Sequence, residues 1–409
     1  MTEPAPPKGT TPLARREARL AWGLLLPTLV SVAVVVLLPL LAIFWISFKP
    51  IGLADLRPPA PVVREALRGS DDALRIEYRL RNSSRDKVIT DVVLTDTLPP
   101  GIDVGALPEI CSIQARTLTC ALPEMPGGYN ERLRIPISTS DPGAAEAAAE
   151  ASDPQVRGNA DNILTNSTLT WDNFARVFDG NEFWTVMGVT LFYTVFGTIG
   201  ALLVGLFAAL LLNKSFRGQG ILRGLYLFPY VAPVIAVAFS WLILFDPFSG
   251  SANALLLQMG ATNEAINFFG QRPLALIMVT VFEIWRYFPL SFLFILARMQ
   301  SIDTDMYEAA DMDGASPFQQ FWYLSLPQLL GILSVLFLLR FIWTFNKFDD
   351  IFLLTGGNAG TRTLTVNVYE QAFAVSNIGA GAAVAVVIFL CLLSFSVFFF
   401  KFVSREEGL

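Results

Sequence analysis

Six long apolar runs dominate the pattern of hydrophobic and polar positions along the chain. Runs of about 20 apolar residues cross the hydrocarbon core of a bilayer as helices. The chain is 53% hydrophobic and only 16% charged, and its mean hydropathy is +0.52. This composition excludes an ordinary soluble domain. The pattern therefore predicts a mainly α-helical integral membrane protein with about six transmembrane helices, at residues 22–46, 184–212, 221–245, 273–298, 328–352 and 379–403.

Basic residues indicate how these spans are oriented. They precede the first run, follow the second and follow the sixth: Lys8, Arg15, Arg16 and Arg19, then Lys214, Arg217 and Arg223, then Lys401 and Arg405. Because cytoplasmic loops are enriched in Lys and Arg, both termini are expected in the cytoplasm. Residues 1–20 are then a cytoplasmic tail and 21–49 the first transmembrane helix. This helix is too long for the apolar core of a cleavable signal peptide, so we expect a signal anchor.

Residues 50–170 form a different kind of sequence, polar and rich in proline, which we expect to fold in water outside the cytoplasm. Apolar and polar residues alternate at 74–80, and strand-like runs follow at 88–94 and 133–137. Turn residues lie between them at 82–84, 99–101 and 126–128. This spacing predicts a small all-β insert, a β-sandwich near 72–140. We expect a linker or loose helix at 143–157.

The three cysteines agree with this topology. Cys111 and Cys120 lie nine positions apart in the insert, where an oxidising compartment favours a disulfide over two free thiols. Such a bond stabilises a small loop by ~2–3 kcal/mol. Cys391 falls in the last apolar run and is expected to be a buried small side chain. The chain has no histidine, and the cysteines lack ligand spacing, so neither a metal nor a haem site is expected.

A short acidic segment lies between the fourth and fifth apolar runs, at 307–327. Glu308, Ala309 and Ala310 favour a helix, Gly314 ends it, and the pair Ser316-Pro317 is typical of a new helix start. The segment therefore predicts two short helices separated by a glycine at the cytoplasmic membrane surface. We expect this pair to bind a soluble partner, with its acidic residues facing a basic socket.

Catalytic signatures are absent from the sequence. The glycines of 356–360 are not followed by the lysine of a phosphate-binding loop, and no G-x-S-x-G motif occurs. Serine–histidine catalysis is excluded by the missing histidine. We therefore expect a chain that is not an enzyme, holds no cofactor and does not itself hydrolyse ATP.

The acidic segment resembles the E-A-A loop of ATP-binding-cassette importer permeases. Glu308-Ala309-Ala310 is followed after three residues by Gly314, and after nine more by Leu324 and Leu326-Pro327. Further similarity, at 171–174, 227–230, 295–302, 345–346 and 353–357, extends the resemblance over about 170–405, to the maltose-type permeases of carbohydrate uptake. The β-sandwich insert and the lack of additional N-terminal helices depart from that pattern.

This resemblance implies the partners and the coupling element. The permease core is 171–405, with five transmembrane helices and a cytoplasmic coupling loop at 303–327. The residues that would couple transport to the ATPase are Glu308, Ala309, Ala310, Asp313 and Gly314. The expected partners are a separate ATPase dimer that binds ATP and Mg, a second permease subunit, an extracytoplasmic solute-binding protein and membrane lipid, but no nucleic acid. The expected location is the bacterial inner membrane.

The insert resembles a repeat of the immunoglobulin-like kind. The segment 78–82 ends in an Asn turn, and 95–101 carries the D-x-L-P-x-G motif that accompanies it. Two roles remain open for such an insert: it grips the solute-binding protein, or it only caps the permease.

Three ionisable residues fall near span centres, where charge is costly and often functional: Glu283, Arg286 and Arg340. Glu283 and Arg286 are three apart on one helix and can face each other, so a self-neutralising ion pair is the alternative to a substrate site. The resemblance places a sugar site at Glu283, Arg286, Tyr287, Leu290, Arg340, Trp343 and Thr344. Stacking on Tyr287 and Trp343 competes with core or lipid packing. The expected substrate is an oligosaccharide or α-glucoside, and the alternative is glycerol phosphate or a polyamine.

Overall fold

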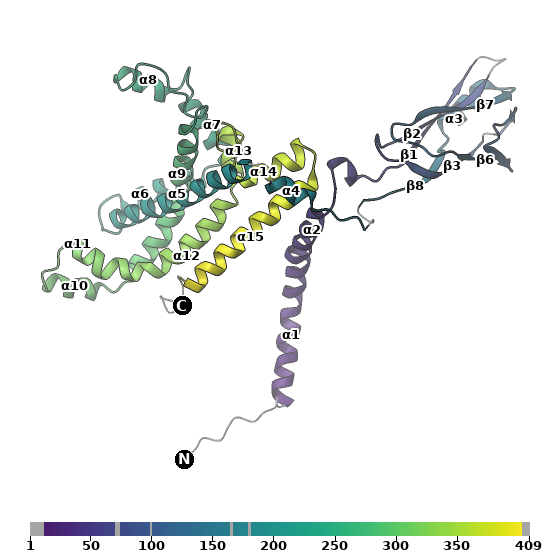
Figure 1. The fold of residues 1–409 in the computed structure, drawn as a ribbon. Helices are drawn as coiled ribbons and strands as arrows, with labels where there is room; N and C mark the ends of the chain where they lie inside the picture. The colour runs from purple at the N-terminus through teal and green to yellow at the C-terminus, as the bar shows by residue number, and fades with distance from the viewer. Residues whose placement is uncertain (1–11, 70–73, 99, 164–166, 179–180, 403–409) are drawn as a thin grey trace. The chain divides into compact units, whose positions relative to one another are not determined.

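The computed structural model describes residues 12–69, 74–98, 100–163, 167–178 and 181–402, which divide into two compact units. The helical unit holds the chain up to Phe48, Trp171–Val375 and the segment from Gly379 onward. The β unit holds Lys49–Thr170 and the short segment Ser376–Ile378. Helices make up almost all of the first unit, whereas the second contains all of the described strands (Figure 1). The mainly helical fold that the sequence predicts is confirmed.

The helical unit is built from long helices joined by short ones. In chain order they are α1 (Pro12–Val32), α2 (Leu38–Ser47), α4 (Asp172–Phe178), α5 (Asn181–Leu212), α6 (Gln219–Val231), α7 (Val234–Leu244), α8 (Ser251–Gln258), α9 (Leu274–Gln300), α10 (Thr304–Met312), α11 (Pro317–Gln320), α12 (Leu326–Phe345), α13 (Asp349–Thr355), α14 (Leu364–Tyr369) and α15 (Ile378–Phe402). Single π-helical turns continue α1, α11 and α14, at Ala33–Leu37, Phe321–Ser325 and Glu370–Ala374.

Among the described residues, five helices are long and apolar enough to cross a membrane: Arg19–Ser47, Glu182–Leu212, Leu274–Gln300, Pro317–Phe345 and Ile378–Lys401. A sixth crossing results if α6 and α7 count as one span, although they meet at an angle of 91°. The bend lies at Ala232 and Pro233, because proline cannot donate the next helical hydrogen bond. The apolar run at 221–245 is therefore interrupted at Pro233.

The run at 328–352 also differs from a single helix. Helix α12 begins earlier, at Leu326, and ends at Phe345, and α13 starts at Asp349. The polar residues Asn346 and Lys347 lie in the break, which places charged groups where an uninterrupted apolar span was expected.

Helices α5 and α9 pack closely because glycines on α5 face α9. A Cβ atom on Gly205 would lie 2.7 Å from the Cβ of Ser291, and one on Gly197 would lie 2.9 Å from the Cγ of Glu283. Small residues allow this approach between membrane helices. The core around them contains side chains of α5, α9 and α12, including Ala209, Phe292 and Leu336. Helix α9 therefore packs against both α5 and α12, the two other helices that carry residues of the candidate site described below.

The β unit is a sandwich of two four-stranded sheets with strand orders β1-β2-β7-β4 and β5-β6-β3-β8. Its strands are β1 (Pro61–Arg68), β2 (Arg75–Asn82), β3 (Ile89–Thr97), β4 (Ile102–Val104), β5 (Cys111–Gln114), β6 (Thr117–Leu122), β7 (Asn130–Thr139) and β8 (Gln155–Ala160). A 3₁₀ turn, η2 (Leu53–Leu56), precedes them, and α3 (Pro142–Glu150) lies between β7 and β8. The strands expected at 74–80, 88–94 and 133–137 are present as β2, β3 and β7.

The sandwich core fills the space between the two sheets. Ile76 and Ile135 from one sheet and Leu94 and Leu118 from the other are all fully buried. A disulfide joins Cys111 to Cys120 across β5 and β6. The strands extend beyond the expected limits of 72–140, because β1 comes before them and β8 after. In the stretch expected as a linker or loose helix, α3 is a formed helix that Asp141 caps by accepting from the Ala144 amide.

Candidate functional site

A buried ion pair joins two membrane helices. Glu283 on α9 and Arg340 on α12 expose 0% and 2% of their surface. The Nη2 atom of Arg340 donates a hydrogen bond to Oε1 of Glu283 at 2.8 Å. Removing two charges from water costs several kcal/mol per ion, so such a pair persists only with good geometry and further hydrogen bonds. Further bonds to Glu283 meet this requirement.

Two hydroxyl groups complete the shell of Glu283. Thr344, one helical turn beyond Arg340 on α12, donates to Oε1 at 2.9 Å. Tyr193 on α5 donates to Oε2 at 3.0 Å. Both are almost fully buried, at 1% exposure each. The carboxylate therefore ties together α5, α9 and α12, and Gly197 provides the space in which it sits.

Arg286 has a different partner from the one that its spacing suggested. Its Nη1 donates to the carbonyl of Pro229 and its Nη2 to the carbonyl of Ala232, both at 3.1 Å. These carbonyls lie at the C-terminal end of α6, where the broken span turns into α7. A cation is favourable at a helix C-terminus and satisfies carbonyls that the helix leaves unpaired. Glu283 forms its ion pair with Arg340. The ion pair between Glu283 and Arg286 that the spacing suggested is therefore not formed.

Three cations surround the ring of Tyr287, the next residue on α9. The ring centre lies 4.9 Å from Cζ of Arg340, 5.6 Å from Cζ of Arg286 and 4.2 Å from Nζ of Lys347. An aromatic face attracts cations at such distances. Tyr287 thus links the ion pair of Glu283 to the break between α12 and α13.

That break carries a second buried acid. Asp350, the second residue of α13, is 0% exposed, and its Oδ2 lies 3.9 Å from Nζ of Lys347. Neither of its carboxylate oxygens has a hydrogen-bond partner among the described residues. The neighbouring Asp349 also lies near Lys347, with 3.6 Å between Oδ1 and Nζ. Within the described chain, no group of three His, Cys, Asp or Glu side chains is arranged to hold a metal ion.

The structure brings together most of the residues that the sequence predicts for a substrate site. One connected cluster contains Glu283, Arg286, Tyr287, Arg340 and Thr344. Leu290 is half-buried on α9, and Trp343 is 52% exposed on α12. Sequence reasoning missed Tyr193, Lys347 and Asp350. For the last two, the signal was the polar interruption 346–350; Tyr193, in an uninterrupted apolar run, had none.

The acidic segment forms a hairpin of two short helices between α9 and α12 (Figure 1). Asp303 caps α10 by accepting from the amide of Asp305 at 3.1 Å. Gly314 follows α10 with φ of 77°, a conformation that favours glycine. Ser316 and Gln319 then form a reciprocal capping box at the start of α11. The structure of this segment therefore agrees with the helix–glycine–helix prediction.

The two helices of the hairpin are held by side-chain hydrogen bonds. Gln320 on α11 donates to Oδ1 of Asp311 on α10 at 2.5 Å, and the hydroxyls of Tyr307 and Ser325 lie 2.9 Å apart. The predicted coupling residues Glu308, Ala309, Asp313 and Gly314 are exposed, and Ala310 is half-buried. Large apolar side chains beside them are also exposed, namely Met312, Phe318 and Tyr323 at 89%, 71% and 78%. The hairpin presents a mixed acidic and apolar surface.

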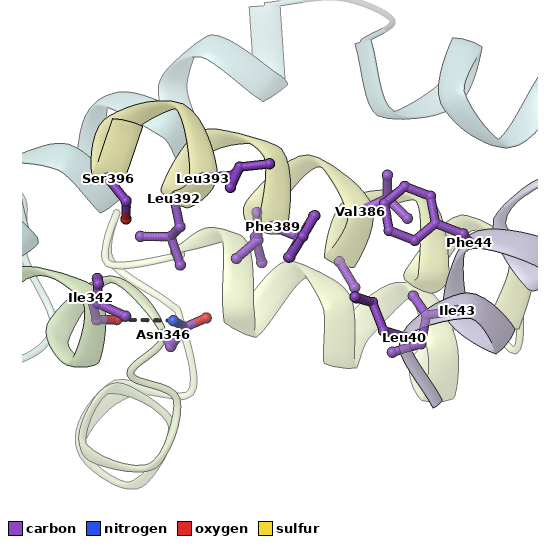
Figure 2. Close-up of a pocket in the computed structure, with 12 residues that line it drawn as sticks. Leu40, Ile43, Phe44, Ile342, Asn346, Val386, Phe389, Leu392, Leu393 and Ser396 are labelled. Carbon is purple, nitrogen blue, oxygen red and sulfur yellow. Dashed lines mark hydrogen bonds between the residues drawn. The ribbon is translucent and has the colours of Figure 1, made fainter. Parts of the chain in front are cut away.

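A separate apolar cavity of about 480 Å³ lies between α2, α12 and α15. Figure 2 shows Leu40 and Phe44 of α2 on one side of it and Phe389 of α15 on another. The side-chain amide of Asn346, which lines it, donates to the carbonyl of Ile342 on the preceding helix α12 at 2.9 Å. A sugar site needs convergent polar groups, so this cavity is not a candidate for one.

A family model described as "Binding-protein-dependent transport system inner membrane component" matches residues 201–406. This match covers half of the chain and includes the Glu283 cluster and the α10–α11 hairpin. The chain belongs to this family. It is therefore a multi-pass inner membrane component of a binding-protein-dependent transport system, and the resemblance found in the sequence is confirmed.

Curated relatives of this inner membrane component are permeases. It is 34% identical over 229 residues to the Escherichia coli (strain K12) inner membrane ABC transporter permease protein YcjO, covering 54% of the chain and 75% of the relative. It is 32% identical over 230 residues to the trehalose/maltose transport system permease protein MalF of Thermococcus litoralis, covering 56% and 77%. It is 32% identical over 248 residues to the sn-glycerol-3-phosphate transport system permease protein UgpA of Yersinia pestis, covering 59% and 82%.

Solved structures show the same fold. A bacterial ABC transporter that imports the acidic polysaccharide alginate has a chain with TM-score 0.52 and 19% identity, over 59% of this component and 86% of that chain. A second structure, of the alginate transporter in complex with an alginate pentasaccharide-bound periplasmic protein, has TM-score 0.54 and 19% identity, over 58% and 83%. At this identity, the likeness establishes the permease fold.

Proposed function

We propose that this permease translocates a sugar, an oligosaccharide or α-glucoside, across the inner membrane. The observation that carries the proposal is the hydrogen-bonded cluster of Glu283, Arg340 and Thr344, which lies on the two helices that flank the α10–α11 hairpin. A movement of the hairpin is transmitted along α9 and α12 directly to these groups. The trehalose/maltose permease among the relatives supports the substrate class.

The charges of the cluster favour a neutral sugar over glycerol phosphate. Arg340 is already paired with Glu283, and Arg286 is bound to two carbonyls. A phosphate would have to displace one of these partners, and displacing Glu283 would leave a buried carboxylate unpaired. Hydroxyl groups of a sugar can instead join the existing hydrogen bonds and contact the face of Tyr287. Because one relative is a permease of sn-glycerol-3-phosphate transport, glycerol phosphate is the second candidate substrate.

We infer that a separate ATPase dimer, which binds ATP and Mg, docks on the α10–α11 hairpin. The exposed acidic and apolar side chains of the hairpin support this, since a docking surface combines apolar contact with charge complementarity. Its coupling residues are Glu308, Ala309, Ala310, Asp313 and Gly314. A second permease subunit, different from this one, completes the channel. Both termini and the hairpin lie in the cytoplasm in this arrangement.

For the β unit we propose an immunoglobulin-like sandwich that grips the extracytoplasmic solute-binding protein. Two four-stranded antiparallel sheets around one core support the fold. Deletion of 61–160, which removes every strand, tests the role: binding-protein docking should weaken. If docking and uptake are unchanged, the unit only caps the permease.

Uptake of labelled maltose or trehalose into cells expressing the whole transporter tests the substrate proposal. Unlabelled α-glucosides should compete, whereas glycerol phosphate and polyamines should not. The matched control is the same transporter with an ATPase subunit that cannot hydrolyse ATP. Competition by glycerol phosphate alone would overturn the sugar proposal in favour of the second candidate.

A further inference from the structure

Arginines cover the outer face of β1, β2 and β7, three of the four strands of one sheet. Because side chains alternate along each strand, Ile76, Tyr78 and Leu80 of β2 enter the core and their neighbours point outward. Those outward positions, together with their partners on β1 and β7, carry seven arginines: Arg64, Arg68, Arg75, Arg79, Arg81, Arg132 and Arg134. We call these residues the arginine face.

The strand register aligns three of these arginines in one row. Arg64 of β1 pairs with Arg79 of β2, and Arg79 pairs in turn with Arg132 of β7. Like charges directly opposite each other across strands are destabilising. The row therefore does not help the sheet to fold, and a bound anion would relieve its repulsion.

One outward acid lies among the strands of the arginine face, and Asp103 lies on the outward side of β4 at the edge of the same sheet. On the described residues of the three strands, the outward acid is Glu77, whose side chain is 12% exposed between Arg132 at 3.3 Å and Arg134 at 3.4 Å. The chain as a whole has a net charge of −6, so the positive charge of this face is opposite in sign to the net charge of the protein. A depression of about 100 Å³, lined by Val62, Arg64, Arg79 and Arg81, opens on the face.

The chemistry of the face favours an anionic surface over a folded protein as its occupant. Its cations are all arginines, which remain charged at any physiological pH and are attracted to the negative surface of an anionic bilayer. The other outward residues on these strands are small or polar, such as Val62, Ala66 and Pro136. Hot spots of protein interfaces combine arginine with aromatic anchors such as Trp and Tyr, and the outward positions of these described strands carry no aromatic side chain.

The connections of the β unit keep it beside a bilayer. Its first residue, Lys49, follows the span Arg19–Ser47 by two positions, and its last, Thr170, precedes the span Glu182–Leu212 by twelve. A group tethered by linkers this short meets the adjacent membrane at high effective concentration. The anionic surface that is always within reach is thus the layer of phospholipid headgroups next to these spans.

We propose that the arginine face binds the phosphate groups of anionic phospholipids and holds the β unit against the membrane surface. An anionic bilayer attracts each nearby cation by about fivefold in partitioning, so three arginines together contribute about a hundredfold. The field of the bilayer reads charge rather than side-chain shape, so lysine should replace arginine here.

Full-length protein in nanodiscs of phosphatidylcholine, mixed with separate vesicles, tests this. Wild-type protein should co-float with vesicles that contain phosphatidylglycerol and not with pure phosphatidylcholine vesicles, and added salt should release it. The triple variant Arg64→Gln, Arg79→Gln and Arg132→Gln should lose about a hundredfold in affinity. The same three positions changed to lysine should bind like wild type, which also shows that the outward substitutions leave the unit folded.

The matched control removes three exposed arginines elsewhere on the β unit, by Arg57→Gln, Arg85→Gln and Arg157→Gln. It should bind almost as wild type. Equal losses in the two triple variants would overturn the proposal, as would binding that ignores phosphatidylglycerol. Release by inorganic phosphate but not by chloride at equal ionic strength would assign the face to a free anion. Loss of solute-binding-protein docking without loss of vesicle binding would assign it to a protein.

Discussion

The carboxylate of Glu283 on α9 and the guanidinium of Arg340 on α12 lie 2.8 Å apart with almost no surface exposed to solvent. Their two helices are the ones that lead into the α10–α11 hairpin from either side. The pair therefore holds together, inside the helical unit, the two helices that flank the hairpin.

Breaking this pair from one side should destabilise the permease. Arg340→Met leaves the carboxylate of Glu283 buried without its cation, and a loss of ~3–5 kcal/mol is expected. The double variant Glu283→Gln with Arg340→Met should recover most of this stability. Thermal unfolding in detergent measures both. If the pair serves only the fold, the double variant also recovers uptake; if it contacts substrate, uptake stays low and KM rises.

Arg286→Met should loosen the break between α6 and α7. The carbonyls of Pro229 and Ala232 lose their donors, and hydrogen bonds from a charged group contribute about 1.5–3 kcal/mol each. Hydrogen exchange should increase at 229–235, while α5 remains protected. Arg298→Met is the matched control, since Arg298 lies on the same helix but is exposed and donates to the Gln328 carbonyl. Equal effects at both positions would contradict a specific capping role.

Gly314→Asp should leave the permease in the membrane but uncouple ATP hydrolysis from uptake. Gly314 has φ of 77° and open space around it, so the substitution strains the backbone by about 1–2 kcal/mol without a clash. ATPase activity and uptake in proteoliposomes are the two readouts. Gly260→Asp is the control, because Gly260 also has positive φ, 68°, and open space, but lies outside the hairpin. Normal uptake by Gly314→Asp would refute docking at this hairpin.

The β unit should lose stability as the pH rises from about 4.5 to about 7, because of Glu65. Burial, with the nearby charge of Asp96 adding to it, raises the pKa of Glu65 from 4.5 to about 7. The folded chain then keeps a proton that the unfolded chain releases near pH 4.5. Stability from this group is present below pH 4.5 and is lost by about pH 7.

Glu65→Gln removes this pH dependence. Thermal unfolding of the β unit, measured in the full-length protein on both sides of the window, should show a smaller decrease for the variant. The hydroxyl of Ser152 offsets only part of this shift, because it donates to Asp96 at 2.9 Å. An unchanged pH profile in Glu65→Gln would mean that another group titrates in this range.

Several features were predictable because they depend on residues close together in the chain. The spacing from Glu308 to Pro327 predicted the hairpin, since its caps at Asp303 and Ser316 and its turn at Gly314 are local interactions. The alternation at 74–80 predicted β2 for the same reason. The strand β8 was missed because its residues, 155–160, include glycine and polar side chains whose burial only the sheet provides.

The partners of the charged residues were not predictable in the same way. Spacing on α9 suggested that Glu283 faces Arg286, yet Glu283 binds residues that are 57 and 90 positions away, Arg340 and Tyr193. Gly197 and its neighbours on α5 determine how closely α9 approaches. The glycines can be seen in the sequence, but which helix packs against them is decided only in the folded unit.

By itself, the sequence determined the apolar spans, the helical hairpin and the family of this chain, because hydropathy, caps and motif spacing are encoded along the chain. Only the tertiary structure decided that the third span is bent by 91°, that Arg286 closes the bend, and that Glu283 pairs with Arg340. The physical reason is desolvation: inside a packed membrane unit each buried charge must find a partner, and that partner is selected by helix packing rather than by distance in sequence.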